Sequence, residues 1–454
     1  MFFRKQHFHF VGIGGIGMSG IAEVLLTLGH RVSGSDLKLS PITQRLSDHG
    51  AKVFVGHQAA NVGSDVTALV VTSAVDETNS EIKEARQRKV PVIPRGELLA
   101  ELMRLKYGIA IGGSHGKTTT TSMTATILSS GGLDPTVVVG GRVSTMGGSN
   151  ARVGQSDLLV VESDESDGSF LKLAPIIAVV TNIDREHLDY YKTFERVLSS
   201  FTDFVNRVPF YGTSILCIDD ENVQRIMPDI RRRVVTYGTS PQADLQIRNI
   251  EMAKASTAFE IRDFGRFEVH VTGAHNVLNA TAAIAVSKEL GLDAASIATG
   301  LAAFQGVDRR FQIKGEAAGV TVIDDYGHHP TEVRATLNAA RQRQFSKIHV
   351  LFQPHRFTRT QILMDDFARS FFDADSVTLL DIYAASEPPI EGVNSGVLID
   401  KMRASGQRDV QYAPGLDAAA AMLAQKAQPG DMVLTLGAGT VSQAGELILA
   451  ELRK

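Results

Sequence analysis

Short apolar runs alternate with segments of helical length along most of the chain. The pattern predicts strands at residues 7–11, 31–34, 53–55, 69–72, 90–94, 109–112, 136–140, 158–161, 176–181, 320–323, 347–352, 377–382 and 432–436. Strands that alternate with helices are typical of parallel sheets whose faces are covered by helices. The chain is therefore predicted to have an α/β fold.

The length of 454 residues corresponds to about three domains. We place domain boundaries just before the apolar run that begins at residue 109 and after residue 312. The predicted domains are therefore 1–106, 107–312 and 313–454. Residues 256–272 depart from the α/β pattern, because polar and apolar residues alternate there around a turn at 263–266. That stretch predicts a β-hairpin attached to the α/β core.

Composition and charge narrow the functional classes. Hydrophobic residues make up 43% and charged residues 21% of the chain, and the formal net charge of −4 gives no reason to expect nucleic acid or an anionic membrane as partner. No apolar run reaches transmembrane length, and the first strand begins too early to leave room for a signal peptide. The only cysteine, Cys217, is expected to be a buried thiol in a reducing compartment. We therefore expect a cytoplasmic protein without membrane insertion.

Residues 109–121, IAIGGSHGKTTTT, have the order of a phosphate-binding loop: strand, glycine-rich turn and helix start. Backbone N–H groups and the positive helix end favour an anion, Lys117 can reach the β- and γ-phosphates, and Thr118 can bind Mg²⁺. The strict Walker spacing fails by one residue when counted from Gly112. A turn that only starts a helix is the alternative, but GKTTT rarely follows an apolar strand by accident.

A second glycine-rich turn follows the first predicted strand. Its spacing is Gly12-x-Gly14-x-x-Gly17, and Asp36 ends the next strand about twenty residues later. In doubly wound folds such glycines allow the backbone to approach a pyrophosphate, and the acid binds a ribose. NAD and UDP both carry a pyrophosphate, so the motif leaves the nucleotide open.

Two strands of the predicted central domain lead to candidate metal ligands. Glu162 follows the run 158–161, His187 follows the run 176–181, and we expect these two strands to be adjacent. Together with Thr118 they can hold Mg²⁺, although Mg²⁺ usually prefers oxygen to nitrogen. The alternatives are a solvated acid for Glu162 and a helix-capping or packing role for His187.

Other polar residues stand at helix starts and strand ends. Asn276 and Asn279 open an alanine-rich helix, where they can cap it or read adenine edges. His328 and His329 suggest a metal, but the following Pro-Thr-Glu favours a helix start. Arg356 and Arg359 lie in HRFTRT after the run 347–352, where their guanidinium groups are either solvated or bind carboxylates.

Several of these motifs together resemble the Mur ligases, the ATP-dependent amide ligases of peptidoglycan synthesis. The motifs cover essentially the whole chain: HFVGIGGIGMSGIAE, GSHGKTTT, VVESDESDGSFL, NIDREHLDYY, HNVLNA, GVDRRF, DDYGHHPTE and FQPHRFTRT. The first and the last two resemble the branch that joins L-alanine to UDP-N-acetylmuramate. Ser114 stands where Thr is usual and Ser163 where Ala is common, and neither change removes a group that the resemblance needs.

The resemblance implies an N-terminal Rossmann-like UDP-binding domain, a central P-loop ATPase domain with an added β-hairpin, and a C-terminal Rossmann-like domain. It implies that ATP and Mg²⁺ serve to convert the lactyl carboxylate of UDP-N-acetylmuramate to an acyl phosphate, which the amine of L-alanine attacks. No position is evident for the carbamylated lysine that several relatives carry. A monomer or weak homodimer is expected.

The resemblance also implies three sets of site residues. ATP would be bound by Gly113, Ser114, His115, Gly116, Lys117, Thr118, Thr119, Asn276, Asn279, Arg310 and Asp325. The sugar nucleotide and alanine would be bound by Gly14, Gly15, Gly17, Asp36, Ser73, Tyr326, His328, His355, Arg356 and Arg359. Catalysis would rest on Lys117, Glu162, His187 and Arg310, with Thr118, Glu162 and His187 as the metal ligands.

Two alternative functions remain. A murein-peptide ligase would join a preformed peptide to the same sugar nucleotide. An NAD-dependent oxidoreductase would use the N-terminal glycine-rich turn for its cofactor, but it would leave the phosphate loop unexplained.

Overall fold

The computed structural model describes residues 5–72, 75–140, 150–253 and 256–454, so Ser73 lies outside the described residues. The chain forms two compact units. The first contains Met1–Ile250, Phe259–Val269 and Val277–Gln305, and the second contains Glu251–Ala258, His270–Asn276 and Gly306–Lys454. Three sheets run through these units, and the predicted α/β class is confirmed. The predicted domain boundaries remain predictions.

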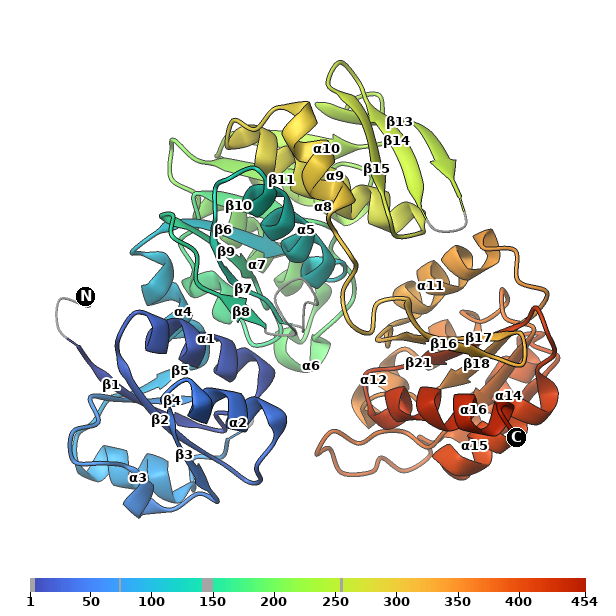
Figure 1. Ribbon diagram of the computed structural model, residues 1–454, viewed down its shortest axis with the longest axis horizontal. Helices are drawn as coiled ribbons and strands as arrows, with labels where there is room; N and C mark the ends of the chain where they lie inside the picture. The colour runs from blue at the N-terminus through green and yellow to red at the C-terminus, as the bar shows by residue number, and fades with distance from the viewer. Residues whose placement is uncertain (1–4, 73–74, 141–149, 254–255) are drawn as a thin grey trace. The chain divides into compact units, whose positions relative to one another are not determined.

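The first unit begins with a five-stranded sheet in the order β3-β2-β1-β4-β5 (Figure 1). Its strands are β1 (His7–Val11), β2 (Arg31–Asp36), β3 (Lys52–Val55), β4 (Ala68–Val71) and β5 (Val92–Pro94). All neighbouring strands are parallel, and β1 lies between β2 and β4. This order places the end of β1, where the glycine-rich turn begins, at the topological switch point where α/β sheets bind ligands.

The second sheet has ten strands in the order β15-β14-β13-β12-β11-β10-β6-β9-β7-β8. Its strands are β6 (Tyr107–Gly112), β7 (Thr136–Val138), β8 (Ala151–Arg152), β9 (Leu158–Glu162), β10 (Ile177–Val180), β11 (Thr213–Cys217), β12 (Val234–Gly238), β13 (Leu245–Met252), β14 (Thr257–Ile261) and β15 (Gly265–Val269). The predicted hairpin is confirmed as β14 and β15, which extend this sheet at its edge. The predicted adjacency of the strands before Glu162 and His187 is wrong, because β6 lies between β9 and β10.

Ten helices lie among the described strands before residue 305, although β7 to β10 and β12 to β15 follow one another without an α-helix between them. They are α1 (Ile16–Thr27), α2 (Pro41–Asp48), α3 (Ser80–Gln87), α4 (Arg95–Met103), α5 (Lys117–Ser130), α6 (Leu188–Tyr191), α7 (Phe194–Asn206), α8 (Glu221–Ile226), α9 (Ala274–Glu289) and α10 (Ala294–Ala302). Local signals begin several of them: Ser40 forms a capping box at α2, and the Thr193 hydroxyl caps α7.

The second unit contains a six-stranded sheet in the order β16-β17-β21-β18-β19-β20. Its strands are β16 (Gln312–Ala317), β17 (Val320–Asp325), β18 (Ile348–Phe352), β19 (Ser376–Leu379), β20 (Val410–Tyr412) and β21 (Met432–Leu436). Its helices are α11 (Pro330–Gln342), α12 (Phe357–Ile362), α13 (Met364–Ala368), α14 (Ser395–Ala404), α15 (Leu416–Lys426) and α16 (Ala444–Leu452). The strands β16, antiparallel to β17, and β20 were not predicted.

The first two sheets share one apolar core, which explains why they form a single compact unit. The cluster includes Phe10 of β1, Phe170 of the segment between β9 and β10, and Phe201 and Phe204 of α7. Phe170 stacks on Phe204 with ring centroids 5.1 Å apart. Cys217 is also buried, as predicted, and burial raises the pKa of its thiol to about 12.

In the second unit, alternate residues of the strands belong to two separate apolar clusters. Ile323, Val350 and Leu434 belong to one cluster, and their neighbours Val322 and Val433 belong to the other. Successive side chains of a strand point to opposite faces, so both faces of this sheet are covered.

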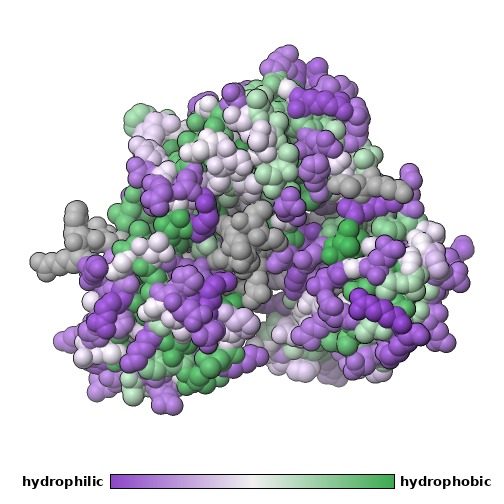
Figure 2. All heavy atoms as spheres, viewed as in Figure 1, coloured by the Kyte–Doolittle hydropathy of each residue, from purple (hydrophilic) through white to green (hydrophobic). Residues whose placement is uncertain are grey.

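On the face drawn in Figure 2, hydrophilic residues are interspersed with small hydrophobic areas. Among the described residues, no helix is long and apolar enough to cross a membrane. Single exposed apolar side chains such as Phe210, 91% exposed, are ordinary on a protein surface and by themselves indicate no partner.

Candidate functional site

The loop between β6 and α5 has a backbone conformation that requires glycine. Gly113 has a φ of +125° and Gly116 a φ of +82°. A Cβ atom at Gly113 would lie 2.1 Å from Thr181 Oγ1, and one at Gly116 would lie 2.3 Å from Asn279 Oδ1. Left-handed backbone and close neighbours therefore both exclude other residue types.

Residues that follow β10 hold this loop in place. Ser114 N donates to Asn182 O at 3.0 Å, and His115 N donates to the Asn182 side chain at 2.8 Å. The Thr181 hydroxyl and the Asn182 amide both donate to the carbonyl of His115. Asp184 N donates to the Ser114 hydroxyl at 2.8 Å. The loop is thus fixed by long-range hydrogen bonds rather than by its own sequence alone.

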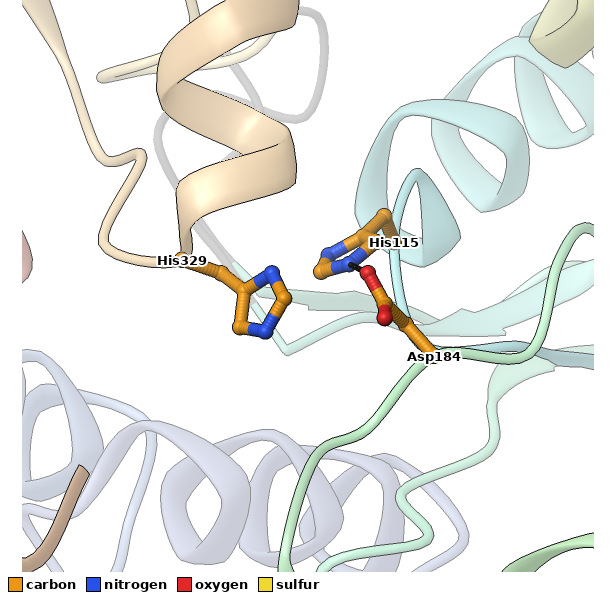
Figure 3. Close-up of side chains that lie close together, drawn as sticks. All are labelled: His115, Asp184 and His329. Carbon is orange, nitrogen blue, oxygen red and sulfur yellow. Dashed lines mark hydrogen bonds and ion pairs between the residues drawn. The ribbon is translucent and has the colours of Figure 1, made fainter. Parts of the chain in front are cut away.

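The side chain of His115 belongs to the same set of bonds. Figure 3 shows its ring facing the Asp184 carboxylate, with Nε2 2.9 Å from Oδ2. His329, also drawn there, belongs to the second unit, where its Nδ1 accepts from Thr331 N and caps α11. The predicted helix start at this histidine is confirmed.

Helix α5 begins at Lys117 and directs its N-terminus at the loop. Its first turns are rich in threonine, which is not a strong helix former. The hydroxyls of Thr121, Ser122 and Thr124 donate to carbonyls four residues earlier. These bonds satisfy the buried hydroxyls, and the helix is stabilised by the burial of most of its residues rather than by their helix propensity. Its first turn presents N–H groups suited to an anion.

Lys117 folds back over the loop. Its Nζ donates to Gly113 O at 2.6 Å, to Ser114 O at 3.0 Å and to Glu165 Oε1 at 2.8 Å. Burial alone would lower the pKa of this lysine, but the adjacent Glu165 carboxylate reverses the effect and raises it. Lys117 therefore carries a positive charge at the centre of the loop.

Thr118 and Glu162 come together beside Lys117, as predicted. The Thr118 hydroxyl donates to Glu162 Oε1 at 3.0 Å, and Gly140 N donates to Oε2 at 2.6 Å. A Cβ at Gly140 would lie 2.9 Å from the carboxylate, so the backbone approaches this acid closely. The pair supplies oxygen ligands of the kind that Mg²⁺ prefers.

His187 lies in a different group of side chains. Its Nε2 is 3.7 Å from Glu165 Oε1 and 3.7 Å from Glu186 Oε2, and these three residues lie close enough to hold a cation. His187 also has a φ of +54° at the N-cap of α6, without a side-chain cap. The three predicted metal ligands are thus found in two groups, Thr118 with Glu162 and His187 with Glu165 and Glu186.

The glycine-rich turn after β1 faces both an acid and a cation. Gly14 N donates to Asp36 Oδ2 at 2.8 Å, so the predicted ribose-binding acid contacts the turn itself. A Cβ at Gly17 would lie 2.8 Å from an Arg95 nitrogen, and Arg95 is paired with Asp164 at 3.3 Å. Arg95 therefore links this turn to the acidic loop after β9. Gly15 is the N-cap of α1.

The two asparagines of α9 have separate settings. Asn276 donates from Nδ2 to Thr272 O, four residues earlier, at 2.8 Å within the second unit. Asn279 accepts from the Thr120 hydroxyl at 3.2 Å and lies against Gly116 of the phosphate loop. Asn279 thus lies beside the phosphate loop, and an adenine-binding role of the two asparagines stays a prediction.

In the second unit, Asp325 at the end of β17 is buried. Its oxygens accept from Phe311 N and Gly327 N, both at 2.7 Å. Burial raises the pKa of Asp325 to about 6, although Arg310 opposes the shift. Arg310 is 3.5 Å from Glu332 and packs over the Tyr326 ring. Asp325 therefore orders the loop that carries Tyr326.

Rings and cations gather at the ends of β17, β18 and β19. His355 lies 5.8 Å from the His328 ring and stacks on Tyr383 at 5.5 Å. Arg359 is within 3.2 Å of His355 Nδ1, and Arg356, with a φ of +68°, is 3.9 Å from Glu387. Burial, together with His328 and the arginines, lowers the pKa of His355 to about 3, so its ring is neutral.

Sequence reasoning missed several residues of these sites. The loop clamp of Thr181, Asn182 and Asp184, the partner Glu165, and the linking Arg95 were not predicted. Each lies in or beside one of the sequence motifs, so its position could have been noticed. Its role depends on the direction of its side chain in the folded protein, which the spacing of residues does not reveal.

An α/β sheet with a glycine-rich loop between a strand and a helix, a largely buried lysine in that loop and neighbouring carboxylates defines a P-loop protein. Three family models match the chain: "Mur ligase family, catalytic domain" over residues 7–107, "Mur ligase middle domain" over 111–287 and "Mur ligase, glutamate ligase domain" over 309–439. The chain therefore belongs to the Mur ligase family, and the resemblance seen in its motifs is confirmed.

Curated relatives match the whole chain. UDP-N-acetylmuramate–L-alanine ligase of Solibacter usitatus is 64% identical, over 100% of this chain and 97% of that protein. The enzyme of the same name from Acidobacterium capsulatum is 56% identical, over 100% and 99%. The crystal structure of UDP-N-acetylmuramate-alanine ligase MurC from Thermotoga maritima has a TM-score of 0.83 and 29% identity, covering 98% of both chains.

Proposed function

We propose that this protein is an ATP-dependent ligase that joins L-alanine to the lactyl carboxylate of UDP-N-acetylmuramate in peptidoglycan synthesis. The observation that carries the proposal is the phosphate loop with Lys117 at its centre, in a chain that matches ligases of this name over its full length. Neither the peptide-adding ligase nor the oxidoreductase is favoured by these matches.

The proposed reaction has two steps. A lactyl carboxylate oxygen attacks the γ-phosphorus of ATP, which forms an acyl phosphate and releases ADP. The amine of L-alanine then attacks the acyl carbon, loses a proton and expels phosphate. Because carboxylate and phosphate are both anionic, the barrier depends on alignment and charge neutralisation, which Lys117 and the N–H groups of α5 supply.

Thr118 and Glu162 fit Mg²⁺, because both offer oxygen within one hydrogen-bonded pair. When bound there, the ion would neutralise phosphate charge. Replacing Glu162 by Gln should raise the Mg²⁺ concentration needed for half-maximal rate, and His187→Ala should act in the same direction. Glu77→Gln makes the same change at an exposed residue and is the control. An unchanged Mg²⁺ dependence in Glu162→Gln would return that residue to a structural role.

The second unit would supply the groups that bind the sugar nucleotide and alanine. Arg359 beside the neutral His355 offers a guanidinium that can hold a carboxylate through two parallel hydrogen bonds. Lysine keeps the charge but not this fork. We expect Arg359→Lys to raise the KM for L-alanine before it affects the KM for ATP.

A single assay tests the proposed function. Phosphate release is measured with L-alanine, serine, glycine or a tripeptide, each with and without UDP-N-acetylmuramate. The expected result is phosphate release that needs both the sugar nucleotide and L-alanine. When the lactyl carboxylate of UDP-N-acetylmuramate is labelled with heavy oxygen, one labelled oxygen should appear in the released phosphate. A preference for the tripeptide, or a nicotinamide-dependent absorbance change without ATP consumption, would contradict the proposal.

The proposal includes a cytoplasmic location and a monomer or weak homodimer. The buried, unpaired thiol of Cys217 suits a reducing compartment. Cell fractionation and sedimentation of the purified chain test these two points.

A further inference from the structure

The ammonium group of Lys117 has no free N–H. Its three donors are taken by the carbonyls of Gly113 and Ser114 and by Glu165 Oε1. Glu165 is the only charged group among these acceptors. A nucleotide phosphate can therefore reach this ammonium only by displacing one of its present partners.

Glu165 is itself held in place. Its side chain is 2% exposed, and its backbone carbonyl accepts from the Tyr191 hydroxyl at 2.6 Å. Its second oxygen, Oε2, is buried and accepts no hydrogen bond from any residue that the structure describes. Lys117 is thus the main charge partner of a carboxylate that has little freedom to move away.

We propose that Glu165 is a positioning residue that holds Lys117 back in the nucleotide-free protein, so that incoming phosphates compete with it for the ammonium. The inference rests on the proposed function, since it assumes that Lys117 meets the phosphates of ATP. Phosphate and carboxylate carry like charges, and the carboxylate left behind would be buried without its partner. Glu165 therefore keeps the lysine in place at a cost to nucleotide affinity.

The test is the dissociation constant of ATP in the presence of EDTA, measured by calorimetry on the full chain. Without a divalent cation, Lys117 is the positive side chain that the loop itself offers to the phosphates. We expect Glu165→Gln to bind ATP about tenfold more tightly. A merely structural role would predict weaker binding, because a damaged loop would lose affinity.

Asp167→Asn is the matched control. Asp167 lies in the same loop, and its Oδ1 accepts from Ser169 N at 2.9 Å, a bond that the asparagine oxygen keeps. The control removes one negative charge without touching Lys117, and its ATP affinity should match that of the parent. If Glu165→Gln fails to fold, Glu165→Asp, whose shorter side chain lengthens the ion pair, should give a smaller tightening.

Lys117→Met completes a double-mutant cycle. This change should weaken ATP binding, and in its background Glu165→Gln should tighten binding by no more than about threefold. Unchanged or weaker binding in a folded Glu165→Gln protein overturns the inference, as does equal tightening in both backgrounds. A parent protein that binds no ATP, or a Lys117→Met variant that binds it like the parent, overturns the proposed function of the loop as well.

Discussion

Two glycine-rich turns of the first unit look alike in sequence and differ in their neighbours. Each follows a buried parallel strand and precedes a helix, one between β1 and α1 and the other between β6 and α5. In the first turn, a carboxylate occupies the N–H of Gly14, and the cation comes from Arg95 on another helix. The second turn carries its own cation, Lys117, which is paired with Glu165.

The difference shows that glycines decide how closely a backbone can approach a ligand, whereas neighbouring charges decide which ligand is favoured. An acid at the first turn suits a ribose hydroxyl next to a pyrophosphate. A lysine at the helix N-terminus of the second turn suits the terminal phosphates of a triphosphate. The two turns can therefore serve different nucleotides within one unit.

The largest effect is expected for Lys117→Ala. Loss of its charge should lower the ligation rate at least a hundredfold, about 3 kcal/mol, while the loop backbone remains. Circular dichroism checks the fold, and Lys172→Ala, which removes a half-exposed pair with Glu97, is the control. Near-normal turnover in a folded Lys117→Ala protein would contradict the claim that the second turn binds the phosphates of ATP through its lysine.

Gly116→Ala and Gly132→Ala separate backbone strain from crowding. Both glycines lie in α5's flanks with φ near +80°, but a Cβ at Gly132 meets nothing within 4 Å. Both variants should lose about 1 kcal/mol of stability from strain. Only Gly116→Ala, which collides with Asn279, should also raise the KM for ATP by about tenfold. Equal ATP constants in the two variants would contradict a crowded phosphate loop.

Gly14→Ala tests the first turn in the same way. The new Cβ would lie 2.8 Å from Asp36 Oδ2 and 2.9 Å from a Thr43 methyl group. We expect the KM for UDP-N-acetylmuramate to rise several-fold, about 1 kcal/mol, with the KM for ATP unchanged. A rise in the ATP constant instead would mean that the turns do not serve separate nucleotides.

The smallest expected effect is a pH dependence of folding stability. It serves as a control, because it distinguishes a variant that has lost its fold from one that has lost only nucleotide binding at one of the two turns. Burial, with the help of Arg310, lowers the pKa of His275 from 6.5 to about 4. Between these values the unfolded chain binds a proton at this histidine that the folded protein does not, so the stability contributed by His275 is fully present above pH 6.5 and is lost as pH falls towards 4. The cost at pH 5.5 is about 1 kcal/mol.

Urea unfolding at pH 7.5 and 5.5 measures this loss. His275→Gln should show a smaller pH dependence by about that amount, and the exposed variant His49→Gln should behave like the parent. An identical pH dependence in His275→Gln would mean that this histidine does not report on the fold.

Local patterns predicted the elements but not their long-range partners. The apolar run before Gly112, the glycines of both turns and the Pro330 helix start depend on neighbours within a few residues, so sequence reasoning found them. The edge strand β16 pairs in an antiparallel direction that its own sequence does not encode. The placement of β6 between β9 and β10 depends on the whole sheet, and adjacency along the chain predicted it wrongly.

The sequence by itself determined the α/β class, the family and the residue types of the phosphate loop, because periodicity, glycine spacing and motif order are written along the chain. Only the tertiary structure decided which acid pairs with Lys117. Several acids lie within residues 157–167, and it is Glu165, whose backbone carbonyl accepts from the Tyr191 hydroxyl, that contacts the lysine. It also decided that His187 lies with Glu165 and Glu186, since a charge takes the partner that folding brings within a few ångströms, whatever their separation in sequence.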